Sequence, residues 1–443
     1  MKKKKQKRFQ VPVQNDLRKN NFLSWIAVFI LIALAFLIYS NSFTGDFQYD
    51  DEIYVEKNYF IRSFDKLGQL CVKSGWRGRT VSLVSFFLNY KIHRLDVFGY
   101  HLVNWLIHLF NGIVVYFLTA LLLSLPKLRD GPWAKHKIIL PFFAAAIFLS
   151  HPIQTQAVSY ISQRQASLAT LFYLFSILAY LKGKVSGRKI NYLFCALSAL
   201  LGMFTKEIVF TLPFALILTD FCFIDEKEGR KISATKAIGL ILLLLIVPLT
   251  FGLDLNNVIL DYRTFSGSHD DDLITWDKYF YTQARVVLVY LRLLALPIHQ
   301  TLDYDFPLSQ SIFQANTFFS YIFLFFLLFL AVKKHKTNIL FSFGVYWFFL
   351  TVSVESSIIP IHHVIFEHRV YLPFFGFALV LCALASEYIT SRKLLLVVFS
   401  LLTLVFSVLT FNRNKIWQDK VLLWTDCLKK SPQRYRPYLN LGN

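Results

Sequence analysis

Residues 22–40 read FLSWIAVFILIALAFLIYS and contain no charged side chain. An apolar helix of about 20 residues is long enough to cross a bilayer core of roughly 30 Å. The chain before it begins MKKKKQKR, and an excess of Lys and Arg marks the cytoplasmic side of a span. Because the stretch lacks a small-residue cleavage site and is longer than a typical signal core, we expect a retained anchor with a cytoplasmic N-terminus.

An acidic stretch follows this first span directly. Residues 45–52 read GDFQYDDE, which places Asp50 and Asp51 just beyond the far membrane face. Two adjacent carboxylates can serve as a general base or hold a cation, because neighbouring like charges raise one of the two pKa values. The alternative is a solvated loop or a helix N-cap, and the residues themselves leave both interpretations open.

The whole composition is that of a membrane protein. Over 443 residues the chain is 55% hydrophobic and 17% charged, with 46 Phe and a mean hydropathy of +0.48, so a water-soluble domain is excluded. The net charge of +20 would suit nucleic acid, but the basic residues cluster in short loops between apolar segments, where membrane orientation accounts for them. The five cysteines show no metal-ligand spacing, so we expect them to be unpaired.

Hydropathy divides the chain into twelve apolar segments. They fall at about 22–41, 100–124, 138–150, 166–181, 190–205, 208–224, 237–252, 278–297, 312–332, 338–354, 370–386 and 393–411. The basic loop 333–336 would lie outside if every segment crossed. Segment 278–297 carries Lys278, Arg285 and Arg292, so we expect it to lie at the interface or to re-enter from outside. The sequence thus predicts an all-α polytopic membrane protein with about eleven transmembrane helices.

This topology predicts three parts. Residues 1–21 form a cytoplasmic basic tail, 22–411 a transmembrane domain and 412–443 an extracytoplasmic tail. The outer loops are 42–99, which includes an amphipathic stretch at 81–90, and 151–165, 253–311 and 355–369. The pattern at 435–443 resembles the opening helix of a tetratricopeptide repeat, although one such helix cannot stand alone.

The second span carries polar side chains on one helix face. His101, Asn104, His108 and Asn111 follow a spacing of three, four and three residues. They either line a polar cavity or join helices by hydrogen bonds, and the second interpretation is the commoner one in membranes.

Several short motifs at the outer ends of spans occur together. They are Asp50-Asp51, GYHLVN at 99–104, HPIQTQAV at 151–158, TKE at 205–207, LDY at 302–304 and EHRVYLP at 367–373. In this order they resemble the bacterial relatives of the transmembrane and tetratricopeptide repeat-containing O-mannosyltransferases, within the protein O-mannosyltransferase superfamily. The resemblance covers most of residues 40–443. Animal members usually carry Glu at the position of Gln156 and an acid near Ala166, so no acid–base role is carried over there.

The resemblance implies a GT-C fold glycosyltransferase with an inverting mechanism, in the inner membrane of a bacterium. It would transfer a sugar from a polyprenyl-phosphate donor to an acceptor, a protein Ser or Thr hydroxyl, on the extracytoplasmic side. Asp50 or Asp51 would take the proton of the acceptor hydroxyl. No fixed cofactor is implied, and a divalent metal is left open.

Cations on the outer side would hold the phosphate, because the guanidinium fork of arginine suits that group. The outer cations are Arg79, Arg164, Lys206, Arg263, Arg285, Arg292 and Arg369, among which we expect Arg369, Arg285 and Arg164 to contact the donor, with Arg79 and Lys206 beside them. The expected cavity-lining residues are His101, Asn104, Glu207, Glu367 and Tyr371. The alternative for Glu207 and Glu367 is a structural ion pair with the nearby Lys206 and Arg369. His269, Asp270, Asp271, Asp272, His362 and His363 lack a metal motif and are interpreted as loop residues.

Two other classes of function compete with this interpretation. A lipid-linked glycan transporter or flippase would also need many spans, but transporters usually show inverted repeats and polar residues at mid-bilayer depth. A non-catalytic scaffold with a protein-binding tail would not need Asp50 and Asp51. The gathering of polar residues at one face favours the enzyme.

Overall fold

The computed structural model of the chain describes residues 21–72, 77–129, 131–224, 244, 274–361 and 363–442. Within these ranges the regular secondary structure is entirely helical. The predicted basic tail before Asn21, the predicted span 237–252 apart from Leu244, Arg263, His269, the acids at 270–272 and His362 lie outside the described residues.

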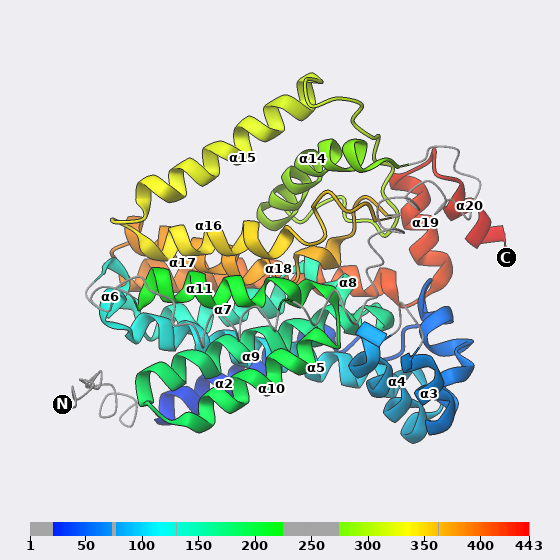
Figure 1. Cartoon of the computed structure of the whole chain (residues 1–443), viewed down its shortest axis with the longest axis horizontal. Helices are drawn as coiled ribbons and strands as arrows, with labels where there is room; N and C mark the ends of the chain where they lie inside the picture. Colours follow the sequence, from blue (N-terminus) through cyan, green and yellow to red (C-terminus); the bar gives the residue numbers. More distant parts are fainter. Residues whose placement is uncertain are drawn as a thin grey trace, which may run out of the picture.

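Long helices run lengthwise through the molecule and form one bundle (Figure 1). Five are long and apolar enough to cross a membrane, and they correspond to α2 (Asn21–Tyr39), α5 (Val97–Ser124), α9 (Arg164–Ser186), α15 (Ala315–Lys334) and α18 (Arg392–Trp417). Four shorter apolar helices accompany them: α7 (Ile139–Ser150), α10 (Lys189–Met203), α16 (Ile339–Val352) and α17 (Phe374–Tyr388). These helices indicate a multi-pass membrane protein, while the total of about eleven crossings stays a prediction.

Two further helices match segments expected from hydropathy. They are α11 (Leu212–Phe223) and α14 (Trp276–Ala295). Among the described residues, α14 belongs neither to the five long candidate spans nor to the four shorter apolar helices. Charged side chains interrupt its apolar surface, and the interface position of 278–297 stays a prediction.

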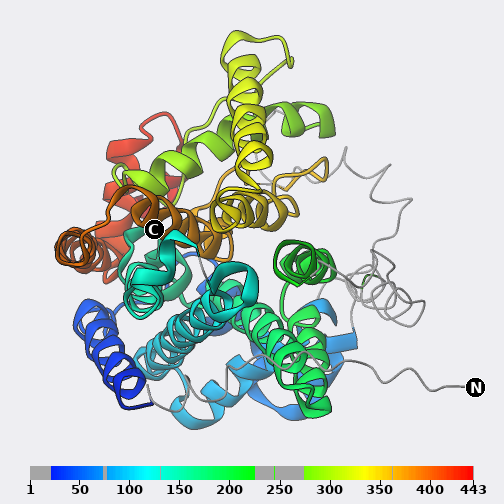
Figure 2. The same ribbon diagram turned by 90° about the vertical axis from the view of Figure 1, so that its left-hand side faces the viewer.

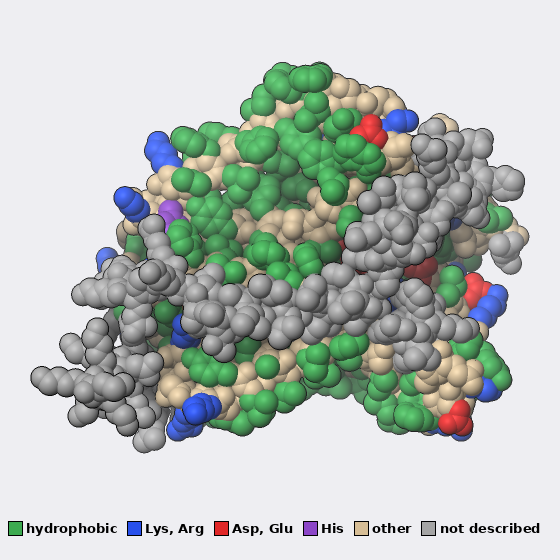
Figure 3. Space-filling view, viewed as in Figure 1, with side chains coloured by type: hydrophobic (Ala, Val, Ile, Leu, Met, Phe, Trp, Pro, Cys, Tyr) green, Lys and Arg blue, Asp and Glu red, His purple; other side chains and the backbone are tan. Residues whose placement is uncertain are grey.

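The surface carries the hydrophobic residues that a lipid-facing belt requires. Phe22, Trp25 and Phe29 of α2 are more than two-thirds exposed, and Phe325 of α15 is 65% exposed. The face in Figure 3 shows hydrophobic side chains over its middle and charged ones mainly toward its two ends. Figure 2 shows α15 at the margin of the bundle. So large an apolar surface is explained by contact with lipid.

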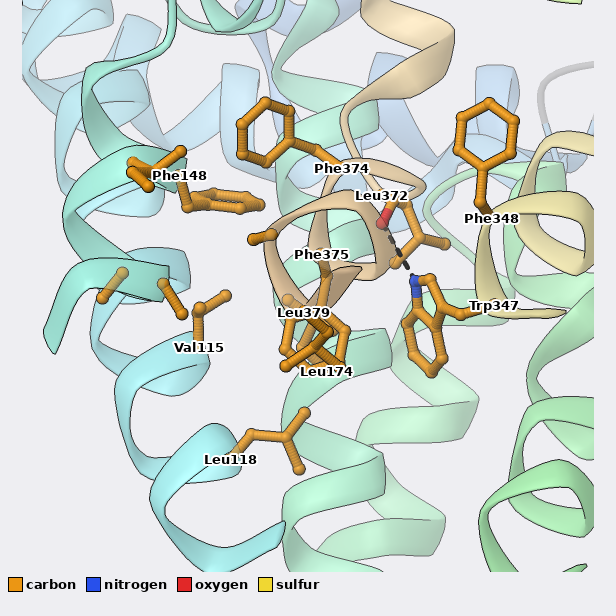
Figure 4. Close-up of a cluster of buried hydrophobic side chains, with 14 of the residues drawn as sticks. Val115, Leu118, Phe148, Leu174, Trp347, Phe348, Leu372, Phe374, Phe375 and Leu379 are labelled. Carbon is orange, nitrogen blue, oxygen red and sulfur yellow. Dashed lines mark hydrogen bonds between the residues drawn. The ribbon is translucent and has the colours of Figure 1, made fainter. Parts of the chain in front are cut away.

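The buried core joins helices that are distant in the sequence. Trp347 of α16 donates a hydrogen bond from Nε1 to the carbonyl oxygen of Leu372 at 3.2 Å, and Phe375 packs edge-on against its ring (Figure 4). Beside it, a Cβ placed on Gly344 would lie 2.5 Å from the carbonyl oxygen of Gly376. The two glycines therefore let α16 and α17 approach backbone to backbone, as small residues do between membrane helices.

The described parts of the predicted outer loops lie at one end of the bundle. Figure 1 shows α3 (Phe64–Val72) and α4 (Thr80–His93) at the end opposite α6 (Pro126–Arg129). Five short helices share that end, because each connects to a long helix that ends there. They are η5 (Pro152–Gln154), α8 (Thr155–Val158) and η6 (Ile161–Gln163) after α7, η7 (Glu207–Thr211) after α10, and η9 (Glu367–Val370) before α17. We call this the loop end.

The C-terminal helices also lie at the loop end. Helix α18 continues to Trp417, so the predicted domain boundary at residue 411 falls inside it. The extra turns are held because Asn414 donates to the Ile38 carbonyl at 3.2 Å and accepts from the Ser159 hydroxyl at 2.7 Å. After it, α19 (Lys420–Lys430) and α20 (Tyr435–Gly442) pack together as a helical pair. A tetratricopeptide repeat stays a prediction.

Candidate functional site

The Asp50–Asp51 pair occupies a tight turn between α2 and η1 (Glu52–Glu56). Asp51 is fully buried, and its two carboxylate oxygens accept hydrogen bonds from the backbone N–H groups of Gln48 at 2.9 Å and Ser162 at 2.6 Å. Asp50 is only partly buried, and its backbone N–H donates to the Tyr160 hydroxyl at 2.9 Å. The structure thus separates the two acids: Asp51 closes the turn, and Asp50 is the less buried of the two.

Burial changes the acidity of both groups. It raises the pKa of Asp50 above its ordinary value, while the Tyr160 hydroxyl and the guanidinium groups of Arg79 and Arg436 oppose the rise. It raises the pKa of Asp51 to about 7, although the N–H groups of Gln48 and Ser162 favour the ionised form. A carboxylate with a raised pKa is better suited to accept a proton near neutral pH.

Five charged residues gather beside this turn, and we call them the charge cluster. Arg79 lies 3.8 Å from Glu207, and both side chains are 27% exposed. Lys206 Nζ lies 2.8 Å from Glu355 Oε1, and Arg369 Nε lies 3.9 Å from the same oxygen. Arg79 also interacts electrostatically with Asp50 and Glu355, which places the charge cluster near the turn.

Exposure divides the charge cluster into an inner and an outer part. The side chains of Lys206, Glu355 and Arg369 are 5%, 6% and 2% exposed. The fork of Arg369 donates to the carbonyl oxygens of Val364 at 2.9 Å and His363 at 2.6 Å, which fixes the loop before η9. Arg79 and Glu207 are the more exposed members of the cluster.

The ion-pair partners differ from those that adjacency in the sequence suggests. Lys206 pairs with Glu355 instead of its neighbour Glu207, because its extended backbone sends adjacent side chains to opposite sides. Burial would raise the pKa of Glu207, but Arg79 and Lys206 outweigh it and hold that pKa below its ordinary value. Glu207 is therefore kept ionised.

The hydrogen-bond partners of Glu367 come from the loop 300–304, and Arg369, its neighbour in the sequence, is not among them. Its carboxylate is buried and accepts from Tyr304 at 2.6 Å, Gln300 at 2.7 Å and the Thr301 N–H at 2.9 Å. Burial raises its pKa, against the nearby Arg413. Glu367 thus ties η9 to the loop 300–304.

The polar face of α5 is buried in helix contacts. The His101 ring shares a hydrogen bond of 2.9 Å with the Gly45 carbonyl, and His108 lies 2.7 Å from the Tyr371 hydroxyl. Asn104 donates to the carbonyls of Val158 and Ile161, and Asn111 donates to that of Ser167. This arrangement matches the interhelical interpretation, and His101 in addition holds the chain that leads to the Asp50 turn.

Arg164 and Arg285 lie in other surroundings. Arg164 is fully buried; it donates to Asn104 Oδ1 at 2.6 Å and to the Tyr100 carbonyl at 3.0 Å, and its guanidinium covers the Phe86 ring. Arg285 donates to the Pro307 carbonyl at 3.0 Å and the Ser309 hydroxyl at 3.2 Å. The charge cluster contains neither residue.

An apolar hollow of about 320 Å³ lies between α11 and α16. Its lining is Phe214, Ile217, Leu218, Phe221, Tyr346 and Leu350. Phe214 lies near the start of α11, which follows η7, and Leu350 lies near the end of α16, so this end of the hollow lies toward the loop end. An apolar hollow of this kind suits the hydrocarbon part of an amphiphile.

Sequence reasoning missed three contributors to the site: Glu355, Asp303 as an ion-pair partner, and Arg436. The available signal for Glu355 was its position as a lone acid after the uncharged run 338–354. No comparable signal marked Arg436, which reaches the site from α20. In the part of the chain that the structure describes, no three His, Cys, Asp or Glu residues are grouped as a metal site, and Cys195, Cys222, Cys382 and Cys427 are free.

Known proteins give an independent view of the chain. A protein O-mannosyl-transferase of Caenorhabditis elegans is 24% identical over 441 residues, covering 93% of this chain and 59% of its own length. The protein O-mannosyl-transferase TMTC2 of Mus musculus is 36% identical over 169 residues, a match that covers 35% of this chain and 19% of the relative. The protein O-mannosyl-transferase Tmtc1 of Drosophila melanogaster is 29% identical over 212 residues, which covers 45% of this chain and 23% of the relative. The chain thus spans less than two-thirds of the length of each of these relatives.

No protein-family model matches the chain. No solved structure matches it either. The worm, mouse and fly relatives nevertheless share one description, since all three are protein O-mannosyl-transferases. At 24–36% identity, the chain is a distant homologue of the TMTC-family protein O-mannosyl-transferases.

Proposed function

We propose that the protein is a membrane glycosyltransferase that moves a sugar from a polyprenyl-phosphate donor to an acceptor hydroxyl on the extracytoplasmic side. The observation that carries the proposal is the meeting of the less buried carboxylate of the pair, Asp50, with the cations of the charge cluster at the loop end. Homology to protein O-mannosyl-transferases supports a protein Ser or Thr hydroxyl as the acceptor.

In this proposal Asp50 is the general base. Its carboxylate takes the proton of the acceptor hydroxyl as that oxygen attacks the anomeric carbon of the sugar. The bond from the anomeric carbon to the phosphate oxygen breaks, and the electron pair leaves with the polyprenyl phosphate. One displacement of this kind inverts the anomeric centre. Asp51 does not touch the reactants; it fixes the turn through Gln48 and Ser162.

The phosphate is assigned to the charge cluster. Arg79, Lys206 and Arg369 carry three positive charges against the two negative charges of Glu207 and Glu355, which leaves a net positive charge for an anion. Arg79 is the accessible member, and Lys206 and Arg369 act from a buried position where electrostatic interactions are stronger. Cations placed where charge develops on a leaving group stabilise the transition state.

The apolar hollow between α11 and α16 is assigned to the first isoprene units of the donor. A donor chain that lies among Phe214, Ile217 and Leu350 would direct its phosphate toward the loop end, where the charge cluster lies. The chain contributes apolar burial, and the phosphate contributes charge-assisted contacts.

Transfer in a purified system tests the proposal. The protein in liposomes is given a short polyprenyl-phosphate mannose and a Ser/Thr-rich peptide, and mass spectrometry follows the peptide. Addition of a hexose by the parent protein but not by the Asp50→Asn variant is expected. Movement of the lipid across the bilayer without any change in the peptide would instead support a flippase and contradict the enzyme.

A further inference from the structure

The C-terminal segment forms part of the wall around the Asp50 turn. Leu423, Trp424 and Cys427 of α19 are buried in one cluster with Tyr160, Leu302, Phe366 and Trp417. Tyr160 is the residue whose hydroxyl accepts from the Asp50 N–H. Figure 1 shows α19 and α20 folded against the loop end of the bundle.

Polar contacts fasten this segment to the bundle. Asp426 pairs with Arg413 of α18 at 2.6 Å, and Lys430 donates to the Gln300 carbonyl at 2.7 Å. The Ser431 hydroxyl accepts from the Asp305 N–H at 3.2 Å. The start of α20 is therefore held at a fixed place beside the loop 300–305.

Arg436 extends from this fixed helix toward the site. Its Nη1 lies 3.1 Å from Asp303 Oδ1 and 3.4 Å from His363 Nδ1, and its side chain is only 11% exposed. The guanidinium carbon lies 5.7 Å from the centre of the Tyr49 ring. A cation enclosed by an acid, an imidazole and an aromatic ring is desolvated, so these contacts are stronger than on an open surface.

A chain of hydrogen bonds leads from Arg436 to the residue before Asp50. His363 Nδ1 accepts from Arg436, which assigns the ring proton to Nε2, and Nε2 lies 3.2 Å from the Tyr49 hydroxyl. Tyr49 has a φ of +41°, a left-handed conformation that is uncommon for a side chain of this size. Such a conformation persists only where surrounding contacts impose it.

The geometry points to Arg436 as a positioning residue of the candidate site. We propose that it holds the Tyr49–Asp50 turn through His363 and the Tyr49 ring, so that the C-terminal segment completes the site. The kinetic consequence rests on the proposed function, whereas the consequence for the turn does not.

Hydrogen exchange of the whole protein in detergent tests the structural part. In Arg436→Gln, amides of a peptide covering residues 46–54 should exchange on the order of tenfold faster than in the parent, because local opening becomes easier. Peptides from α7 should not change. Lys429→Gln removes an exposed charge from the same segment and is the matched control. Parental exchange at 46–54 in both Arg436→Gln and Arg436→Lys would overturn the proposal.

Transfer kinetics test the consequence for the site. A displaced Asp50 should lower kcat of Arg436→Gln by roughly ten- to a hundredfold, with the donor KM unchanged. The charged and titratable groups that face Asp50 are Arg79, Arg436, Tyr160, Tyr49 and Asp51. Loss of one of the two cations should also move the acid limb of the pH profile of kcat/KM to higher pH, and Arg436→Lys should restore the limb.

A merely structural loosening would lower the rate at every pH and leave the limb in place. An unchanged limb together with a parental kcat in Arg436→Gln would therefore overturn the positioning role. If the parent protein transfers no sugar, the proposed function fails, and the exchange experiment still decides whether Arg436 holds the turn.

Discussion

At the scale of the residue, Asp50 and Asp51 have different tasks. Asp50→Asn keeps the shape of the side chain and removes its basicity, so turnover should fall by about 10²–10⁴ with donor binding nearly intact. Asp51→Asn should act through the turn, since one of its two N–H partners, Gln48 or Ser162, then loses a carboxylate acceptor. Rate and donor-binding measurements on both variants distinguish these effects.

If both single Asn variants transferred sugar at the parental rate, both aspartates would be structural, and the assignment of Asp50 as the base would be wrong. Equal loss of turnover without any loss of stability in Asp51→Asn would place the base at Asp51 instead.

Arg369 and Arg285 share a predicted role but lie in different surroundings. Removing a charge-assisted hydrogen bond to the donor phosphate by Arg369→Ala should weaken donor binding by about 1.5–3 kcal/mol. Arg285→Ala should weaken it less, because the Arg285 guanidinium contacts Pro307 and Ser309 and not the charge cluster. Titration of each variant with a polyprenyl-phosphate sugar measures the difference. Unchanged affinity in both variants would show that neither arginine binds the donor phosphate.

At the scale of the element, the close crossing of α16 and α17 depends on two glycines. Gly344→Ala would bring a Cβ to 2.5 Å from the Gly376 carbonyl oxygen, so the helices must separate. Overpacking of this kind costs about 1–3 kcal/mol, and the melting temperature in detergent should fall. Gly68→Ala on α3 is the control, since a Cβ there meets nothing within 4 Å; an equal fall in both variants would contradict the crossing as the cause.

Helix α14 is expected to begin and end on one side of the membrane. Trp276 is its first residue and Leu296 follows its last; they are 57% and 61% exposed, so a cysteine at either position is open to a reagent. A membrane-impermeant maleimide added from outside should label Trp276→Cys and Leu296→Cys alike. Labelling of only one of them would show that α14 crosses the membrane, and the predicted side of every later loop would then be reversed.

At the scale of the whole molecule, the loop end is predicted to face away from the cytoplasm. Tyr59→Cys in the loop after α2 and Lys429→Cys in α19 should react with an impermeant reagent in intact cells. Lys336→Cys, in the basic loop between α15 and α16, should react only after permeabilisation. Reaction of Tyr59→Cys and Lys429→Cys from opposite sides would contradict the topology.

Much of this architecture was predictable because its signals are local. An uncharged run such as 22–40 must become a helix in lipid, since the helix is the conformation in which a single segment satisfies its own backbone hydrogen bonds. Alternating basic loops then predict which loops share a side, and the structure brings the described parts of those loops to one end. Asp50, Arg79, Lys206, Glu207 and Arg369 were expected there and do meet.

The helical membrane class, the order of the apolar segments and the polar residues expected at one end therefore follow from local sequence. Three features needed the folded chain: Asp50 is less buried than Asp51, Asn104 and Tyr100 enclose Arg164, and Glu355 and Arg436 join the site. The physical reason is that hydropathy depends on neighbours along the chain. Burial, side-chain direction and ion-pair partners depend on contacts between residues more than a hundred positions apart, such as Lys206 with Glu355.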